Sequence, residues 1–153
     1  MIKYLKLIGF FNGFTDNELG MVSSITEVIS TRDMEIILKE SEAPKGLYFI
    51  VNGDFDVVKN IGGNKYKRLQ RLNRGDFFGE MSILNDEMHS ASVVCRSKGT
   101  LLFISKEAFN EMSDSDSRFS LKIMKELASI LARRLRHMNM KYGMSVAQLE
   151  SKS

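Results

Sequence analysis

Short runs of β-favouring residues, separated by turn signals, fill the middle of the chain between about residues 26 and 104. β-branched and aromatic residues are frequent in the runs 35–39, 47–51, 55–59, 66–72, 90–96 and 100–104. Asn52-Gly53 predicts a tight hairpin between the second and third runs, and Gly62-Gly63 predicts another turn. Strands this short and evenly spaced favour a β-sandwich or a β-barrel. The segment 79–84 interrupts the strands with one helical turn.

Helices are predicted on both sides of the strand region. Thr15 and Glu18 have the spacing of a capping box, and Ser105 is placed to cap a short helix that runs to Met112. Residues 5–14 form an apolar stretch without a small-residue cleavage site, so they indicate a packed helix rather than a signal peptide.

A long helix is predicted over about residues 117–149. Its apolar residues recur in steps of three and four, which is a heptad seam; they are Met124, Leu127, Leu131, Leu135, Met138, Tyr142, Val146 and Leu149. Some 30 residues make a helix of roughly 45 Å, longer than a small barrel needs. The extra length favours a partner helix from a second subunit. The alternatives are a helix that lies wholly on its own domain and one that ends early at Gly143.

Composition excludes several classes of function. The chain has 153 residues, enough for one domain with a core, and no apolar run long enough to span a bilayer. The single cysteine, Cys95, lies in an apolar run and fits a buried thiol in a reducing cytoplasm. No catalytic motif is present, and His89 with His137 makes a weak case for a metal. Seven basic residues and one acidic residue lie between 118 and 141, which indicates a solvated helix face or a nucleic-acid contact.

Two motifs give the chain a resemblance to a known family. Residues 47–53, Leu-Tyr-Phe-Ile-Val-Asn-Gly, and residues 74–81, Arg-Gly-Asp-Phe-Phe-Gly-Glu-Met, resemble the cyclic-nucleotide-binding domain. Residues 131–143 are similar to the dimerisation helix that follows the sensor domain in bacterial cyclic AMP receptor proteins. The resemblance implies a mainly β fold, a double-stranded β-helix (jelly-roll) barrel with N-terminal helices and a long C-terminal helix. It implies one domain over residues 1–153, with the barrel at about 26–104.

The resemblance also implies a ligand site for cAMP or cGMP, with no cofactor and no metal. By this resemblance, Glu80 would accept a hydrogen bond from the ribose 2′-hydroxyl, and the N–H groups of residues 79–82 would face the phosphate. Ser90 and Ser92 would donate hydroxyls to it, and Asn139 would read the base. The full set of implied ligand-binding residues is Phe78, Gly79, Glu80, Met81, Ser82, His89, Ser90, Ala91, Ser92, Leu69, Gln70, Arg134, Met138 and Asn139.

The chain departs from the family pattern at the phosphate. His89 stands where the family has an arginine, and Met34 and Ser41 replace two turn glycines. Losing a charged hydrogen bond worth about 1.5–3 kcal/mol weakens binding roughly 10- to 100-fold. Protonated histidine supplies part of that charge, and its unperturbed pKa is about 6.5.

Two hypotheses follow for the function. One is a stand-alone regulatory sensor that binds a cyclic nucleotide or small anion weakly, more tightly at low pH. The other is a degenerate, non-binding domain that acts as a dimeric interaction module through its long helix. The expected partners are the ligand, a second copy of the chain and an unidentified downstream protein. Nucleic acid and membrane are not expected, and the chain is not expected to be an enzyme.

Overall fold

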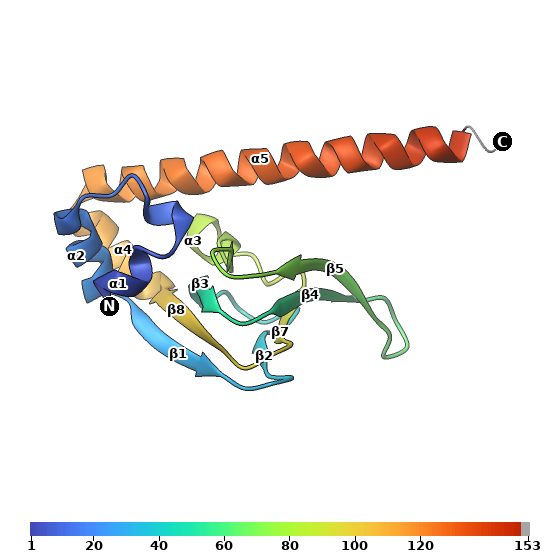
Figure 1. Cartoon of the computed structure of the whole chain (residues 1–153), viewed down its shortest axis with the longest axis horizontal. Helices are drawn as coiled ribbons and strands as arrows, with labels where there is room; N and C mark the ends of the chain where they lie inside the picture. Colours follow the sequence, from blue (N-terminus) through green and yellow to red (C-terminus); the bar gives the residue numbers. More distant parts are fainter. Residues whose placement is uncertain (151–153) are drawn as a thin grey trace. The chain divides into compact units, whose positions relative to one another are not determined.

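The computed structural model describes residues 1–150, so residues 151–153 of the predicted domain lie outside the described residues. The chain divides into two compact units, Met1–Ser115 and a second unit that begins at Asp116. The first unit holds every strand of the described chain, and the second holds one long helix (Figure 1). The predicted boundary of a single domain over 1–153 stays a prediction.

The N-terminal segment forms three short helices, α1 (Ile2–Leu5), η1 (Gly9–Phe11) and α2 (Asp16–Ser24). The prediction of one packed helix over 5–14 is therefore wrong, because the chain turns between α1 and η1. The segment is nevertheless packed, since the rings of Phe10 and Phe11 lie 5.1 and 4.9 Å from the ring of Phe49. The capping box is confirmed: Thr15 Oγ1 accepts from the N–H of Glu18, and Glu18 accepts from the N–H of Thr15.

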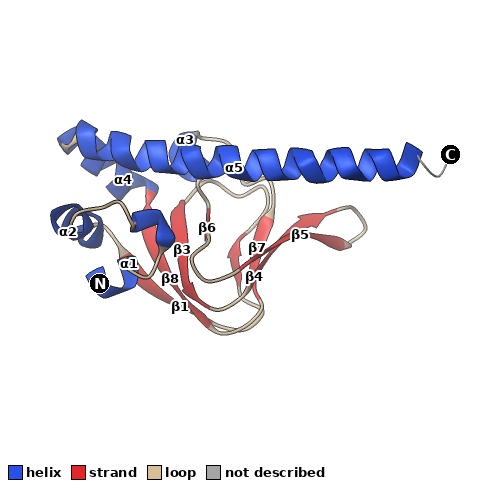
Figure 2. Ribbon diagram, turned by 45° about the horizontal axis from the view of Figure 1, so that its top comes forward, coloured by secondary structure: helices blue, strands red, loops and turns tan. Residues whose placement is uncertain are grey.

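Eight strands form two antiparallel sheets of four (Figure 2). One sheet has the order β1 (Glu27–Thr31), β8 (Gly99–Ser105), β3 (Gly46–Asn52), β6 (Phe77–Phe78). The other has the order β2 (Ile36–Leu38), β7 (Ser92–Cys95), β4 (Phe55–Asn60), β5 (Tyr66–Leu72). Residues of both sheets, among them Tyr48, Ile50, Phe55 and Cys95, share one buried core cluster. The predicted mainly β fold class, with N-terminal helices and a long C-terminal helix, is confirmed.

Cys95 is fully buried, and its Sγ donates to the carbonyl of Ser97 at 3.0 Å and lies 3.2 Å from Thr31 Oγ1. The prediction of a buried thiol in an apolar strand is therefore confirmed, since Cys95 lies at the end of β7. A buried sulfur with two polar neighbours has its weak hydrogen-bonding capacity satisfied.

The hairpin predicted at Asn52-Gly53 is wrong. The turn exists, but it joins β3 of one sheet to β4 of the other, and the two strands do not pair. Gly53 adopts φ +94°, and a side chain there would overlap the backbone of Gly99. The chain passes from sheet to sheet at this close approach, which requires glycine. The turn at Gly62-Gly63 does close a hairpin, because the N–H of Ile61 donates to the carbonyl of Lys65.

The last strand leads into α4 (Lys106–Ser115), whose first turn is capped as predicted: the N–H of Ala108 donates to Ser105 Oγ at 3.1 Å. The second unit is the helix α5 (Ser117–Glu150), which continues through Gly143, so an early end at that residue is excluded. Among the described residues, no helix combines the length and hydrophobicity that crossing a membrane requires.

Candidate functional site

The segment that connects β6 to β7 carries half of the predicted ligand residues. It begins at Gly79, which has φ +79°, and continues through the single-turn helix α3 (Met81–Leu84). A Cβ on Gly79 would overlap the carbonyl oxygen of Gly46 in β3, so glycine is required both by the backbone and by the space. The N–H of Ser82 donates to the carbonyl of Gly79 at 3.0 Å, so this amide already serves the turn.

Two buried polar atoms of this segment have no hydrogen-bond partner among the described residues: Ser82 Oγ and His89 Nε2. The Ser82 residue is fully buried, and His89 is 8% exposed. A buried polar group without a partner costs about 1–3 kcal/mol, so proteins rarely keep one without a use. Both atoms belong to residues that the sequence assigns to the ligand site, and both are able to donate a hydrogen bond.

His89 is held by its backbone to the loop that precedes β3. Its N–H donates to the carbonyl of Glu42 at 3.0 Å, and its carbonyl accepts from the N–H of Ser41 at 2.8 Å. Burial lowers the pKa of His89 below 6.5, and the nearby Lys45 ammonium lowers it further, while the Glu42 carboxylate acts in the opposite direction. The ring is therefore biased toward its neutral form, in which one nitrogen donates and the other accepts.

Ser90 and Ser92 are placed differently from one another. Ser92 opens β7 and is buried, and its Oγ accepts from the N–H of Glu40 at 2.9 Å, which leaves its own hydroxyl hydrogen for donation. Ser90 is exposed and precedes the strand, so the prediction that both serines lie on it is wrong. The carbonyl of Ser90 accepts from Lys59 Nζ at 2.6 Å.

Glu40 and Lys59 form an ion pair beside these serines, and no sequence pattern predicted it. Lys59 Nζ lies 2.5 Å from Glu40 Oε1, and the N–H of Asn60 donates to Glu40 Oε2 at 3.1 Å. The hydrogen bond from Lys59 lowers the pKa of Glu40 below 4.5, and the bond from Asn60 adds to this. A hollow of about 420 Å³ lies here, lined by Lys39, Glu40, Ser41, Asn60, Gly62, Tyr66 and Ser92.

The remaining predicted residues divide between the two units. Gln70 pairs with Val57, and Ser92 pairs with Val58, so these two residues flank β4 in one sheet. Glu80 is half-buried at the start of α3 and makes no capping bond with its side chain. Leu69 and Met81 are exposed, and Ala91 is partly buried. The last three, Arg134, Met138 and Asn139, lie on α5 in the second unit, and their roles stay predictions.

Comparisons with known proteins agree with this fold. The family model for the cyclic nucleotide-binding domain matches residues 28–116. The chain is 26% identical over 114 residues to the cGMP-dependent protein kinase egl-4 of Caenorhabditis briggsae. The match covers 73% of this chain and 15% of the kinase. It is 32% identical over 109 residues to the cGMP-dependent protein kinase of Toxoplasma gondii, covering 71% of this chain and 10% of that one. The chain therefore spans only a small part of these relatives.

Two solved structures show the same architecture. A cyclic nucleotide-binding domain from Methylobacillus flagellatus superposes with a TM-score of 0.80 at 20% identity, over 88% of this chain and 79% of that one. The catabolite activator protein of Thermus thermophilus gives a TM-score of 0.75 at 25% identity, over 88% and 62%. They confirm the predicted jelly-roll fold. Because the family model matches more than half of its length, this chain belongs to the cyclic nucleotide-binding domain family.

Proposed function

We propose that residues 78–92 form a weak, pH-dependent receptor site for a cyclic nucleotide, cAMP or cGMP, within a regulatory domain that is not an enzyme. The observation that carries the proposal is the pair of buried, unpartnered donors, Ser82 Oγ and His89 Nε2. A phosphate oxygen offers strong acceptors to both atoms. The similarity to kinases named for their dependence on cGMP supports a cyclic nucleotide as the ligand.

The charge of His89 decides how tightly the phosphate is bound. In the ligand-free protein, burial and Lys45 hold the pKa of His89 below 6.5, so the ring is neutral at pH 8. A phosphate diester favours the imidazolium, so binding takes up a proton. Above the ligand-free pKa, the affinity then rises by up to about tenfold for each unit of pH decrease. Glu42 and Lys45, which pair with each other at 3.5 Å, are the charged groups that bear on this titration.

Titration calorimetry with cAMP and cGMP at pH 6 and pH 8 tests the proposal. We expect binding in the range of tens of micromolar or weaker, with higher affinity at pH 6. A ligand without charge, adenosine, serves as the control, because its binding should not depend on the protonation of His89. Absence of heat with either cyclic nucleotide at millimolar concentration, at both pH values, would refute a receptor function.

A second candidate function, a dimeric interaction module, is favoured by the apolar seam of α5. Leu135, Met138, Tyr142 and Leu149 are 59%, 64%, 74% and 69% exposed in the single chain. Four large apolar side chains in steps of three, four and seven suit the seam of a two-stranded coiled coil. Light scattering should give the mass of a dimer for the wild type and of a monomer for Leu135→Glu with Tyr142→Glu. A monomeric wild type at all concentrations tested would rule out this module.

Dimerisation alone does not decide between the receptor and the degenerate, non-binding module, since a dimer formed by α5 leaves the assignment of residues 78–92 unchanged; the calorimetry decides between them. In either case we propose a cytoplasmic protein that passes its signal to another protein. The cytoplasmic location rests on the reduced thiol of Cys95, which is buried and has no second cysteine to bond with.

A further inference from the structure

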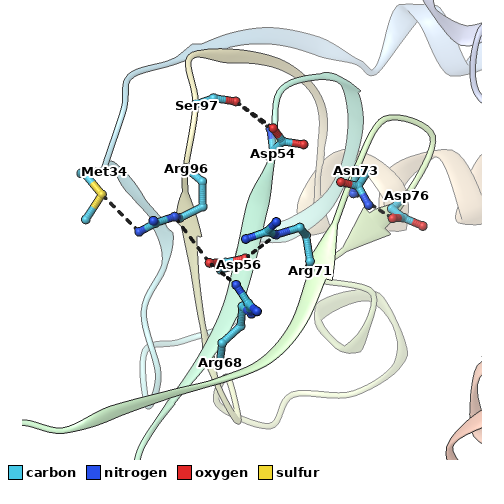
Figure 3. Close-up of polar contacts among 9 residues, drawn as sticks. All are labelled: Met34, Asp54, Asp56, Arg68, Arg71, Asn73, Asp76, Arg96 and Ser97. Carbon is cyan, nitrogen blue, oxygen red and sulfur yellow. Dashed lines mark hydrogen bonds and ion pairs between the residues drawn. The ribbon is translucent and has the colours of Figure 1, made fainter.

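Three arginines surround one buried carboxylate on the second sheet. Arg71 Nε and Arg96 Nε lie 3.4 and 3.5 Å from the two oxygens of Asp56, and Arg68 Nη1 lies 3.9 Å from Asp56 Oδ2 (Figure 3). The side chain of Asp56 is 8% exposed, whereas those of Arg68, Arg71 and Arg96 are 55%, 53% and 47% exposed. We call these three side chains the arginine cluster.

A β-bulge brings two of these arginines to one carboxylate. Side chains three positions apart on a regular strand point to opposite faces of the sheet. In β5, however, Gln70 pairs with Val57 and Arg68 pairs with Val58, so Leu69 is an extra residue in the strand. The bulge allows both Arg68 and Arg71 to reach Asp56. Bulges of this kind re-aim side chains, so the convergence is built into the strand rather than made by flexible side chains.

The arginine cluster has more positive charge than Asp56 neutralises. Three guanidinium groups and one carboxylate leave a net charge of +2, and each guanidinium carries five N–H donors in a fixed fork. Residues 65–74 of β5 and its flanks contribute five basic and no acidic residues, namely Lys65, Lys67, Arg68, Arg71 and Arg74. All three guanidinium groups stay about half-exposed, so each keeps donors for a partner beyond Asp56.

The position of β5 indicates the shape of the partner. β5 is the last strand of the order β2-β7-β4-β5, so one of its edges carries backbone groups that no described strand pairs with. Its side chains are exposed from Tyr66 to Arg71. Such an edge accepts an extended peptide by strand addition, and basic residues beside it select for acidic side chains.

We propose that β5 and the arginine cluster form a docking surface for an extended, acidic segment of a partner protein. The segment adds a strand to the free edge of β5, and its carboxylates bind the guanidinium groups of Arg68 and Arg71, the two members of the arginine cluster that this strand carries. This surface includes no residue of 78–92, although Leu69 and Gln70 of the implied ligand set also lie in β5, and the proposal does not depend on nucleotide binding. The existing partner of the cluster is a carboxylate, and strand addition needs a peptide backbone, so a protein segment is favoured over nucleic acid.

Fluorescence anisotropy with a labelled ten-residue peptide of alternating glutamate and valine tests the charge requirement, at 50 and 200 mM salt. We expect saturable binding that is weaker at the higher salt, and at least about tenfold weaker for Arg68→Gln with Arg71→Gln, which removes two charge-assisted contacts. The matched control is Lys125→Gln with Arg133→Gln, which removes the same charge from α5 and should leave binding unchanged. Equal binding of a peptide with glutamine in place of glutamate would overturn the proposal.

Two further arms test the backbone requirement and the class of partner. Two versions of the peptide are compared, one methylated on the odd-numbered backbone nitrogens and one on the even-numbered. Their affinities should differ, because only one of these two sets of N–H groups faces β5 in an added strand. Equal binding by both would refute strand addition. Single-stranded DNA of equal charge should bind less tightly than the peptide; tighter binding that the double variant removes would assign the surface to nucleic acid instead. Thermal unfolding establishes that each variant is folded, and Arg68→Gln alone, which loses the longest contact to Asp56, carries the test if the double variant unfolds.

Discussion

Replacing His89 with arginine tests the assignment of the ligand site most directly. The site offers a buried, unpartnered Nε2, so a guanidinium placed there would meet a bound phosphate at close range. A hydrogen bond to a charged group contributes about 1.5–3 kcal/mol, which corresponds to roughly 10- to 100-fold tighter binding of cAMP or cGMP. Without ligand the same guanidinium is a poorly solvated charge near Lys45, whose ammonium already disfavours a cation at this position. We therefore expect His89→Arg to lower the thermal stability of the ligand-free protein and to increase the stabilisation by ligand.

The measurement is titration calorimetry at pH 8, where the wild-type ring is neutral and the difference from arginine is largest. The advantage of His89→Arg should shrink at pH 6, because the wild-type histidine gains its proton there while arginine is charged throughout. His89→Gln is the control: it keeps a polar side chain, but its binding should not vary between pH 6 and pH 8. If a folded His89→Arg protein binds neither nucleotide more tightly than the wild type at pH 8, residue 89 does not face the phosphate.

Three other changes probe the fold around the site. Met34→Gly and Ser41→Gly should each stabilise the protein by about 0.5–1 kcal/mol, since both residues adopt positive φ (60° and 66°) where glycine avoids strain; a lower midpoint in urea unfolding would contradict this. Gly79→Ala should cost roughly 2–5 kcal/mol, from φ +79° and the overlap with Gly46, and circular dichroism on heating measures the loss. The ligand-free protein should lose stability as pH falls below about 6.5, because folding lowers the pKa of His89 and the unfolded chain therefore binds more protons. Urea titrations from pH 8 to pH 5 give the free energy of unfolding at each pH. Its decrease toward low pH should be smaller for His89→Gln than for the wild type.

Local signals in the sequence predicted local structure well. The capping box at Thr15, the cap at Ser105 and the turn at Gly62-Gly63 each depend on residues a few positions apart, and each is present. The resemblance also marked Met34 and Ser41 as replaced glycines, and both have the positive φ that a glycine would favour. Structural features that depend only on residues close together in the chain can therefore be predicted from the sequence.

Features that depend on distant contacts were not readable in the same way. Asn52-Gly53 has the composition of a hairpin, yet the turn links two sheets because Gly53 passes against Gly99. The missing partners of Ser82 and His89 follow from burial, which spacing does not give. The ion pair of Glu40 with Lys59 joins residues 19 positions apart. The convergence of Arg68 and Arg71 on Asp56 requires a bulge, and alternation of side chains along a regular strand predicts the opposite.

The aromatic packing at the start of the ligand segment places a spectroscopic probe, Tyr48, beside Gly79. The chain has four tyrosines and no tryptophan. Among the tyrosines, all within the described residues, Tyr48 is the buried one; its ring stacks on Phe78 at 4.9 Å and 6°, and burial raises the pKa of Tyr48 to about 12. The same ring lies 3.2 Å from the point where a Cβ on Gly79 would be. We therefore expect the tyrosine band of near-ultraviolet circular dichroism to be sensitive to the packing at Gly79 without any added label, up to the strongly alkaline pH at which Tyr48 ionises.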